Sequence, residues 1–183
     1  MSRKVKILFS LSIVALLLDQ VSKLWARTLE VRPAITVIEG WMNLIYVENR
    51  GAAWGLFSDW PEAVRLPFFI GISLTAFGLI LFFVRRLKSE DTLPLIGLAM
   101  VLGGAIGNFI DRIAFMHVVD FIDVYYETRH WPTFNVADIF ISLGVGCLLL
   151  EIFFGKSELS AAGAGRSRTE NPPAPALARE LDE

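Results

Sequence analysis

The residues of this chain that could do chemistry lie at the ends of long apolar runs. Asp120 falls in a polar connection between two such runs, and Asp138 lies at the start of the second one. Charged groups at membrane depth are costly, so they are candidates for function by default. Two carboxylates held close together share one proton, because the pKa of one of them rises. One could then take a proton from water while the other gives one to a leaving amine, which would cleave a peptide bond.

Spacing predicts which other residues would accompany this pair. Three residues of the apolar run that precedes Asp120 are spaced four apart and would share one helix face: Gly104, Asn108 and Arg112. Asn135 and Asp138 are three apart and would share a face where the next helix begins. The connection over about 114–133 must turn back if the two helices are antiparallel. Asp120 would then lie at the same depth as Asp138.

Structural roles for the same acids stay open at this point. Asp138 could be a helix cap or a first-turn acid that the helix dipole favours. Asp120 could pair with Arg112 only to hold the structure. Asp123 competes with Asp120 for membership of the pair on the same grounds.

Other site chemistries find weaker support. His117 and His130 have no zinc-motif spacing, and one cysteine, Cys147, excludes an internal disulfide and a cysteine metal site. Cys147 itself fits a small buried or lipid-facing residue. Ser142 lies in an apolar run without an obvious base, which argues against serine catalysis. We therefore expect no metal and no cofactor.

Four apolar segments must position the candidate residues. The chain is 54% hydrophobic, and its long apolar runs lie at about 7–25, 66–84, 93–112 and 136–154. A helix of about 20 residues spans a bilayer, and a helix satisfies its own backbone there. The expected fold class is an all-α membrane protein of four transmembrane helices with a small extracytoplasmic β-sheet. The sequence contains no stripe of basic residues that would indicate binding to nucleic acid.

The first apolar segment has two interpretations. Arg3, Lys4 and Lys6 before an apolar stretch resemble a secretory signal peptide. The sequence after Asp19 offers no convincing cleavage site, and Asp19 could pair with Lys23 on one helix face. We interpret the segment as an uncleaved membrane helix, with a cleaved signal as the alternative.

Charge flanks predict the orientation. Four spans place both termini on one side, and basic flanks at 3–6 and 85–88 favour a cytoplasmic location for that side. The bias is not clean, because six arginines fall on the other side: Arg27, Arg32, Arg50, Arg65, Arg112 and Arg129. The five tryptophans also lie on the outer side, as an interfacial belt would.

Segments outside the spans have their own signatures. Residues 34–38 and 41–47 are rich in β-branched and aromatic residues, which predicts two strands separated at Gly40. Both would belong to an extracytoplasmic region of about 33–57. Residues 1–156 form one membrane domain in this reading. Residues 157–183 are rich in Ala, Pro and Gly and predict a disordered cytoplasmic tail. A GxxxG at Gly103 and Gly107 predicts close helix packing, with a dimer contact as the alternative.

Five motifs in one order carry a family resemblance. They are Leu18-Asp19-Gln20 with Lys23, Asn49-Arg50-Gly51-Ala52-Ala53, Gly104 with Gly107-Asn108 and Asp111-Arg112, Val118-Val119-Asp120-Phe121, and Phe134-Asn135 with Ala137-Asp138. Over about residues 5–155 the chain resembles the bacterial lipoprotein signal peptidases (signal peptidase II). That family consists of intramembrane aspartyl proteases with four transmembrane helices and a small extracytoplasmic sheet. They remove signal peptides from prolipoproteins by cleaving before a diacylglyceryl-modified cysteine.

The resemblance implies roles for individual residues. Asp120 and Asp138 would be the catalytic pair. Five residues match positions that line or brace the site: Asn49, Gly104, Asn108, Arg112 and Asn135. Three polar residues match structural positions: Asp19, Lys23 and Asp111. Trp54 departs from the family, which more usually has Phe, and should alter packing rather than the reaction.

The resemblance also implies partners and a location. The partners would be diacylglyceryl-modified prolipoproteins and membrane lipids, with no nucleic acid, and we expect a monomer. The location would be the bacterial cytoplasmic (inner) membrane, with the site facing its extracytoplasmic side. Two other functions stay open: a small transporter using Asp19, Asp120 and Asp138 as an ion path, and a structural protein using the GxxxG face.

Overall fold

Four long helices and a small sheet make up the part of the chain that the computed structural model describes, residues 3–88 and 90–155. The helices are α1 (Arg3–Ala26), α2 (Glu62–Arg86), α3 (Thr92–Phe115) and α4 (Val136–Leu150). By length and hydropathy each can cross a membrane, α4 together with the turn that follows it (Glu151–Gly155). The expected tail at 157–183 lies outside the described residues.

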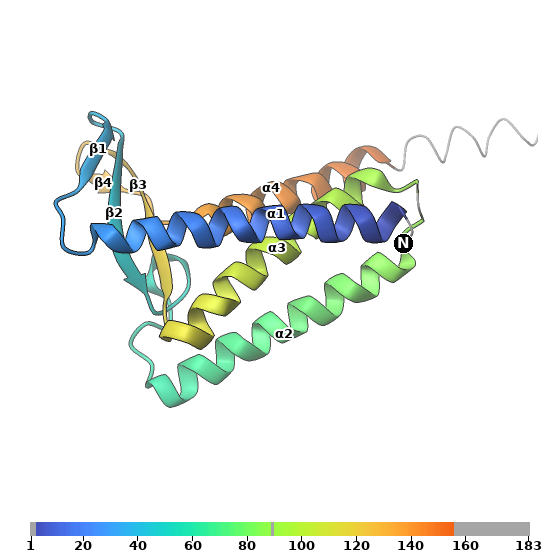
Figure 1. Cartoon of the computed structure of the whole chain (residues 1–183), viewed down its shortest axis with the longest axis horizontal. Helices are drawn as coiled ribbons and strands as arrows, with labels where there is room; N and C mark the ends of the chain where they lie inside the picture. The colour runs from blue at the N-terminus through green and yellow to red at the C-terminus, as the bar shows by residue number, and fades with distance from the viewer. Residues whose placement is uncertain (1–2, 89, 156–183) are drawn as a thin grey trace, which may run out of the picture.

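Helix α3 is the centre of the bundle. It packs against α1, α2 and α4, and half of its most apolar window is buried, against 22% or less for the other three helices. Figure 1 shows α3 running obliquely between α1 and α4 on one side and α2 on the other. Large apolar side chains of α1, α2 and α4 remain exposed on the outside. An outer surface of this kind suits contact with lipid.

Glycines let α3 approach its neighbours closely. A Cβ at Gly103 would lie 2.6 Å from the carbonyl oxygen of Ser12 in α1. A Cβ at Gly104 would lie 2.5 Å from the carbonyl oxygen of Ala137 in α4. Gly103 and Gly107 thus serve close packing of α3 on α1 of the same chain, as the GxxxG pattern predicts.

The sheet lies at one end of the bundle (Figure 1) and is antiparallel, in the order β1-β2-β3-β4. Its strands are β1 (Ile35–Ile38), β2 (Met42–Asn49), β3 (Val118–Tyr126) and β4 (Arg129–His130). The expected hairpin is β1 and β2. The connection between α3 and α4 supplies the other two strands, β3 and β4, which were not expected from the sequence.

The first part of β3 is buried on both faces and closes the sheet onto the helices. Val119, Phe121 and Ile122 form a buried cluster with Ala26 at the end of α1. Phe134 and Val136, next to the start of α4, pack against the same cluster. This packing holds β3 against the ends of two helices, which places its polar residues at the helix–sheet junction.

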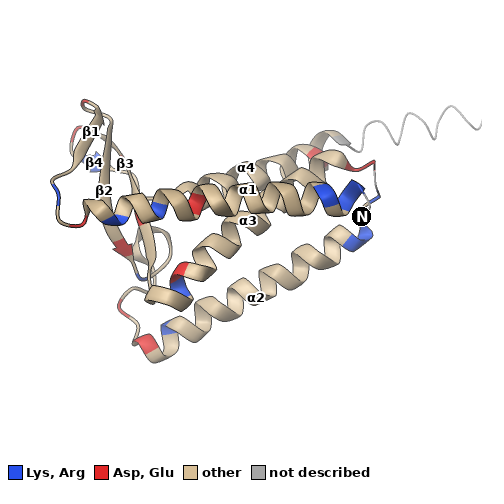
Figure 2. Cartoon of the chain, viewed as in Figure 1, with Lys and Arg blue, Asp and Glu red and all other residues tan. Residues whose placement is uncertain are grey.

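Charged residues are concentrated at the two ends of the bundle. Figure 2 shows lysines and arginines where α1 begins and α2 ends, and further charges near the sheet. The helix segments between them carry few charges, as a bilayer core requires. The helix–sheet junction is the end that combines buried acids with a cavity.

Candidate active site

Asp120 lies on β3, opposite Val47 of β2, and its side chain is only 1% exposed. The two carboxyl oxygens accept hydrogen bonds from two different elements, the N-terminal cap of α4 and strand β2. Asn135 Nδ2 donates to Oδ1 at 2.7 Å, and Asn49 Nδ2 donates to Oδ2 at 2.8 Å. The carboxyl group is therefore fixed in orientation by two neutral amides.

Asp138 lies in the first turn of α4 and takes part in its N-terminal cap. Asn135 is the N-cap residue: its Oδ1 accepts from the backbone N of Asp138 at 3.1 Å, and Asp138 Oδ2 accepts from the backbone N of Asn135 at 3.1 Å. This reciprocal pair is a capping box. The structural role considered for Asp138 is thus present, and its other oxygen, Oδ1, accepts from Asn108 Nδ2 at 2.9 Å.

Two asparagines connect the carboxyl groups. Asn135 is fully buried and donates both to Asp120 and, at 3.2 Å, to Asn108 Oδ1. Asn108 in turn donates to Asp138. Each of the four carboxyl oxygens therefore accepts one hydrogen bond from Asn49, Asn108 or Asn135, which holds the two acids in one rigid network.

The pKa of Asp120 is raised from its ordinary value to about 7. The main cause is burial, which disfavours the charged carboxylate, and the second is the neighbouring charge of Asp138. Hydrogen bonds from Asn49 and Asn135 and the charge of Lys23 act in the opposite direction. Near neutral pH Asp120 can therefore still hold a proton, as one member of a proton-sharing pair must.

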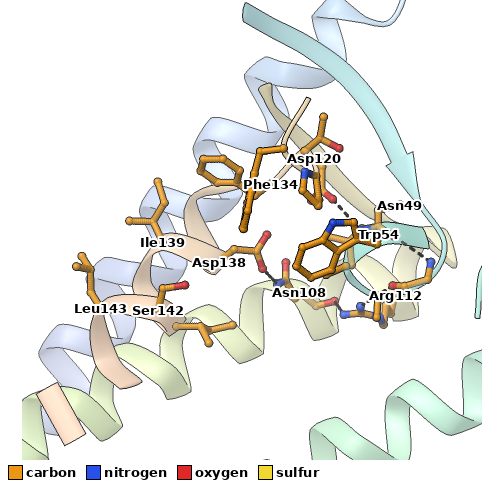
Figure 3. A pocket seen from close by; sticks show the side chains of 18 residues that line it. Asn49, Trp54, Asn108, Arg112, Asp120, Phe134, Asp138, Ile139, Ser142 and Leu143 are labelled. Atoms are coloured by element: carbon orange, nitrogen blue, oxygen red, sulfur yellow. Dashed lines mark hydrogen bonds between the residues drawn. The ribbon is translucent and has the colours of Figure 1, made fainter. Parts of the chain in front are cut away.

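Both carboxyl groups line one cavity of about 580 Å³. Figure 3 shows Asp120 and Asp138 reaching it from two elements, with Asn108 and Arg112 of α3 along one side. Most of the remaining wall is apolar, and its large side chains are Trp54, Trp131, Phe134, Ile139, Ile141 and Leu143. The three α4 residues extend the cavity away from the acids, along the helix.

Arg112 lies at the wall of the cavity, where it holds the loop after β2. Its Nη2 is 3.5 Å from the carbonyl oxygen of Gly51, and its Nη1 donates to the carbonyl oxygen of Asn108 at 3.3 Å. The guanidinium lies 4.8 Å above the ring of Phe69. Within the described residues Arg112 forms no salt bridge with Asp120, so the structural pairing considered from the sequence is not observed.

Two tryptophans from distant segments meet at the cavity. The rings of Trp54 and Trp131 are 5.5 Å apart in an edge-to-face arrangement. Trp54 has a φ of 56° in the short helical turn Ala53–Gly55, a left-handed conformation that is uncommon for a large side chain. From the sequence, Trp54 was expected near the site, Phe134 was named only within a motif, and Trp131 only as one of the outer tryptophans. That Trp131 and Phe134 line the cavity was not predicted.

Asp123 takes part in a different group on the outer part of the sheet. His130 Nδ1 lies 2.8 Å from its Oδ1, and Asn43 Nδ2 lies 3.5 Å from its Oδ2. Asp123 is not among the residues that line the cavity. The geometry therefore favours Asp120 over Asp123 as the partner of Asp138.

The remaining polar residues of the motifs form a buried cluster beside the cavity. Lys23 Nζ lies 2.9 Å from Asp19 Oδ2 and 3.1 Å from Asp111 Oδ2. Asp19 also accepts from the backbone N of Ala137, and Asp111 accepts from that of Val119. The cluster therefore ties α1 and α3 to the starts of α4 and β3.

The residues considered for serine or metal chemistry do not lie together in one site. Ser142 lines the cavity, Cys147 lies further along α4, and His117 Nδ1 is 3.8 Å from Glu48 Oε2. Over residues 3–88 and 90–155, no group of three or more His, Cys, Asp or Glu side chains is placed to hold a metal ion.

Known proteins resemble this chain in sequence. The sequence model of one protein family, described as Signal peptidase (SPase) II, matches residues 11–154. A "Lipoprotein signal peptidase" of Geobacter sulfurreducens is 43% identical over 139 residues, which cover 75% of this chain and 86% of the relative. One of Syntrophus aciditrophicus is 42% identical over 148 residues, covering 80% and 92%.

Solved structures are similar as well. One described as a bacterial membrane enzyme has a TM-score of 0.69 and 25% identity, covering 90% of this chain and 94% of that one. A second with the same description has a TM-score of 0.66 and 29% identity, covering 80% and 92%. The similarity therefore extends over the helices and the sheet together.

Proposed function

This chain belongs to the signal peptidase II family, and we propose that Asp120 and Asp138 are the aspartyl pair with which it cleaves prolipoproteins before a diacylglyceryl-modified cysteine. As a lipoprotein signal peptidase the protein is a hydrolase that crosses the membrane several times. The observation that carries the proposal is a single cavity that receives both carboxyl groups, each held by asparagine side chains.

The pair would act by sharing one proton. Asp120, whose pKa is raised to about 7, holds the proton, and Asp138 accepts one from a water molecule. The oxygen of that water attacks the carbonyl carbon of the scissile bond. The C–N bond then breaks, and the proton of Asp120 passes to the leaving amine. One proton remains on the pair at the end, so the cycle balances.

Neighbouring side chains would position the substrate. Arg112 is held over Phe69 at the cavity wall and can bind a substrate carbonyl in line with the attacking water. Asn49 binds Asp120 and also accepts from the backbone N of Gly51, so it links the acid to the loop that carries Trp54. That loop would close over the bound peptide.

The apolar wall would receive the membrane-embedded part of the substrate. Ile139 and Leu143 of α4 are exposed on the same helix that carries Asp138, and both line the cavity. A diacylated substrate brings its own membrane anchor, so an apolar wall that continues to the lipid-facing side of α4 suits it. The protein would act as a monomer in the bacterial inner membrane.

The site would face the extracytoplasmic side. The basic ends of α1 and α2 lie at the opposite end of the bundle from the sheet (Figure 2), and residues of β2 and β3 line the cavity. The positive-inside rule then places the termini in the cytoplasm and the sheet outside.

Cleavage of a purified substrate tests this function. The full chain in detergent is mixed with a prolipoprotein that carries the diacylglyceryl group and with the same protein lacking it. We expect the modified substrate to yield a product whose N-terminal residue is the lipidated cysteine, and the unmodified substrate to be cleaved far more slowly. Equal cleavage of both, or cleavage at another bond, would contradict the proposed specificity.

A further inference from the structure

The ammonium group of Lys23 contacts the site as well as the buried salt bridges. Its side chain is 1% exposed, and Nζ donates to Asn108 Oδ1 at 2.8 Å. Asp19 Oδ2 and Asp111 Oδ2 lie at 2.9 and 3.1 Å from the same atom. An ammonium has three N–H donors and no acceptor, so these three oxygens use its whole hydrogen-bonding capacity.

This contact decides the orientation of the Asn108 amide. Lys23 can only donate, so the amide atom that faces it must be the oxygen. Asn135 Nδ2, a second donor, approaches the same oxygen at 3.2 Å. The Nδ2 group of Asn108 is thereby turned the other way, and it donates to Asp138 Oδ1 at 2.9 Å.

We infer that Lys23 is a positioning residue for the reaction, because it holds Asn108 in the orientation that donates a hydrogen bond to Asp138. The inference rests on the proposed function, in which Asp138 belongs to the catalytic pair. With Lys23 absent, only the longer contact from Asn135 Nδ2, at 3.2 Å, would hold this orientation, and Asn108 would be freer to rotate and present its oxygen to the carboxylate of Asp138. Two acceptors would then face each other, and Asp138 would move away from its place beside Asp120.

The charge of Lys23 adds a second effect that a purely structural residue would not have. It lowers the pKa of Asp120, while the charge of Asp138 raises it. The charged groups that act on Asp120 are Asp138 of α4, Lys23 of α1 and Arg112 of α3. The neutral side chains of Asn49 and Asn135 donate hydrogen bonds to it. Loss of the ammonium should raise the pKa of Asp120 further and move the loss of activity at high pH to a still higher pH.

Removing Lys23 alone is a poor test, because Asp19 and Asp111 would remain buried without their cation. Asp111→Asn removes one negative charge and keeps an oxygen acceptor for Val119 N and Lys23, so the contact of Lys23 with Asn108 is preserved. Lys23→Met in that background removes the ammonium and keeps an unbranched side chain. The double variant removes one cation and one anion together, so the net charge of the cluster stays that of the parent, and Asp19 keeps its hydrogen bonds from Ala137 N and Gln20 Nε2. Comparing Asp111→Asn with Asp111→Asn/Lys23→Met therefore tests the ammonium of Lys23 with one uncompensated acid instead of two.

The experiment measures kcat, KM and the pH profile of cleavage of a diacylglyceryl-modified prolipoprotein for both variants, with thermal unfolding on the same samples. Relative to Asp111→Asn, we expect the double variant to lose about 10- to 100-fold in kcat with little change in KM, as a displaced catalytic group does. The upper limb of its pH profile should lie at higher pH. If the double variant does not purify folded, Asp19→Asn and Asp19→Asn/Lys23→Met provide the same comparison.

Equal kcat in the two variants would overturn the inference. A lower kcat with an unmoved pH profile would also overturn it, since that result fits a loss of structure alone. Asp138→Asn in the same assay separates the two proposals: activity in that variant contradicts the catalytic pair itself. An inactive Asp138→Asn together with a fully active double variant contradicts only the role of Lys23.

Discussion

At the scale of single residues, Asp120 and Asp138 reach one cavity by different local means. Asp120 is carried by a strand and buried at 1% exposure, whereas Asp138 is held by the capping box of α4. The same asparagine, Asn135, caps the helix and donates to Asp120. The capping role of Asp138 is compatible with its proposed catalytic role, because the capping box uses only one of its two carboxyl oxygens, Oδ2.

The first prediction concerns the acids themselves. Asp120→Asn and Asp138→Asn should each reduce cleavage by about 10²- to 10⁴-fold or more, the contribution of acid–base catalysis. The double variant should be hardly worse than either single one, because members of a catalytic unit are not additive. The measurement is turnover of a diacylglyceryl-modified prolipoprotein, with thermal unfolding on the same samples.

Asp123→Asn is the matched control for this prediction. This variant changes the same residue type on the same strand. The side chain of Asp123 contacts His130 and Asn43, however, and does not line the cavity. It should keep most of the activity. Full activity in either Asp120→Asn or Asp138→Asn would end the aspartyl hypothesis, and inactivity that accompanies unfolding would leave the structural role standing.

The second prediction follows from the raised pKa of Asp120. Its folded pKa of about 7 exceeds its ordinary value of 3.8, so between these values the folded state binds more protons than the unfolded one. Stability should therefore fall as the pH rises from about 4 to 8. Asp120→Asn lacks this titration, so the difference in unfolding free energy between variant and parent should shift in favour of the variant as the pH rises. Parallel stability curves for the two proteins would contradict the assignment.

At the scale of elements, α3 decides the geometry of the site, because it carries Asn108 and Arg112 and contacts every other helix. Gly104 lies one turn before Asn108 and sets how closely α3 approaches α4. The hydrogen bond between Asn108 and Asp138 crosses the same interface. The separation of α3 and α4 and the geometry of the proposed catalytic site are thus coupled through Gly104, which has no side chain.

The third prediction tests this coupling. Gly104→Ala places a methyl group 2.5 Å from the Ala137 oxygen and 2.9 Å from Ile141 Cγ1, so α3 and α4 must separate. Overpacking of this kind costs about 1–3 kcal/mol, and activity should fall as Asn108 leaves Asp138. Gly78→Ala in α2 is the control, because no atom lies within 4 Å of its added Cβ. Thermal unfolding and cleavage assays compare the two, and an equal response in both would argue against close packing at Gly104.

At the scale of the whole molecule, the buried acids gather at one end of the bundle. Asp19 reaches the start of α4 and Asp111 the start of β3, so both lie beside the junction that holds Asp120 and Asp138. An ion path would instead need acids spread through the depth of the bilayer. The arrangement therefore favours a protease over the transporter considered from the sequence.

The fourth prediction concerns orientation. In a Cys147→Ser background, Arg129→Cys should react with a membrane-impermeant thiol reagent in intact cells, because β4 belongs to the sheet expected outside. Lys88→Cys, at the basic end between α2 and α3, should be protected until the cells are opened. Labelling of position 88 with protection at position 129 would invert the topology.

The sequence alone determined the features that depend on local pattern. The apolar runs correspond to α1–α4, because a bilayer demands long apolar helices whatever their partners. The β1–β2 hairpin followed from residue types and Gly40. The pairing of Asp19 with Lys23 needed only their spacing along one helix. Each of these is a property of residues within a few turns of one another.

The tertiary structure decided what joins distant segments. β3 has a strand-like composition, but only its register with β2, Val47 opposite Asp120, brings Asn49 to that acid. Trp131 meets Trp54 across 77 positions of the chain, and Lys23 meets Asn108 across two packed helices. Such contacts depend on how closely helices and strands approach, which no local pattern encodes. The residues of the site could thus be proposed from the sequence, whereas the hydrogen bonds that orient them could not.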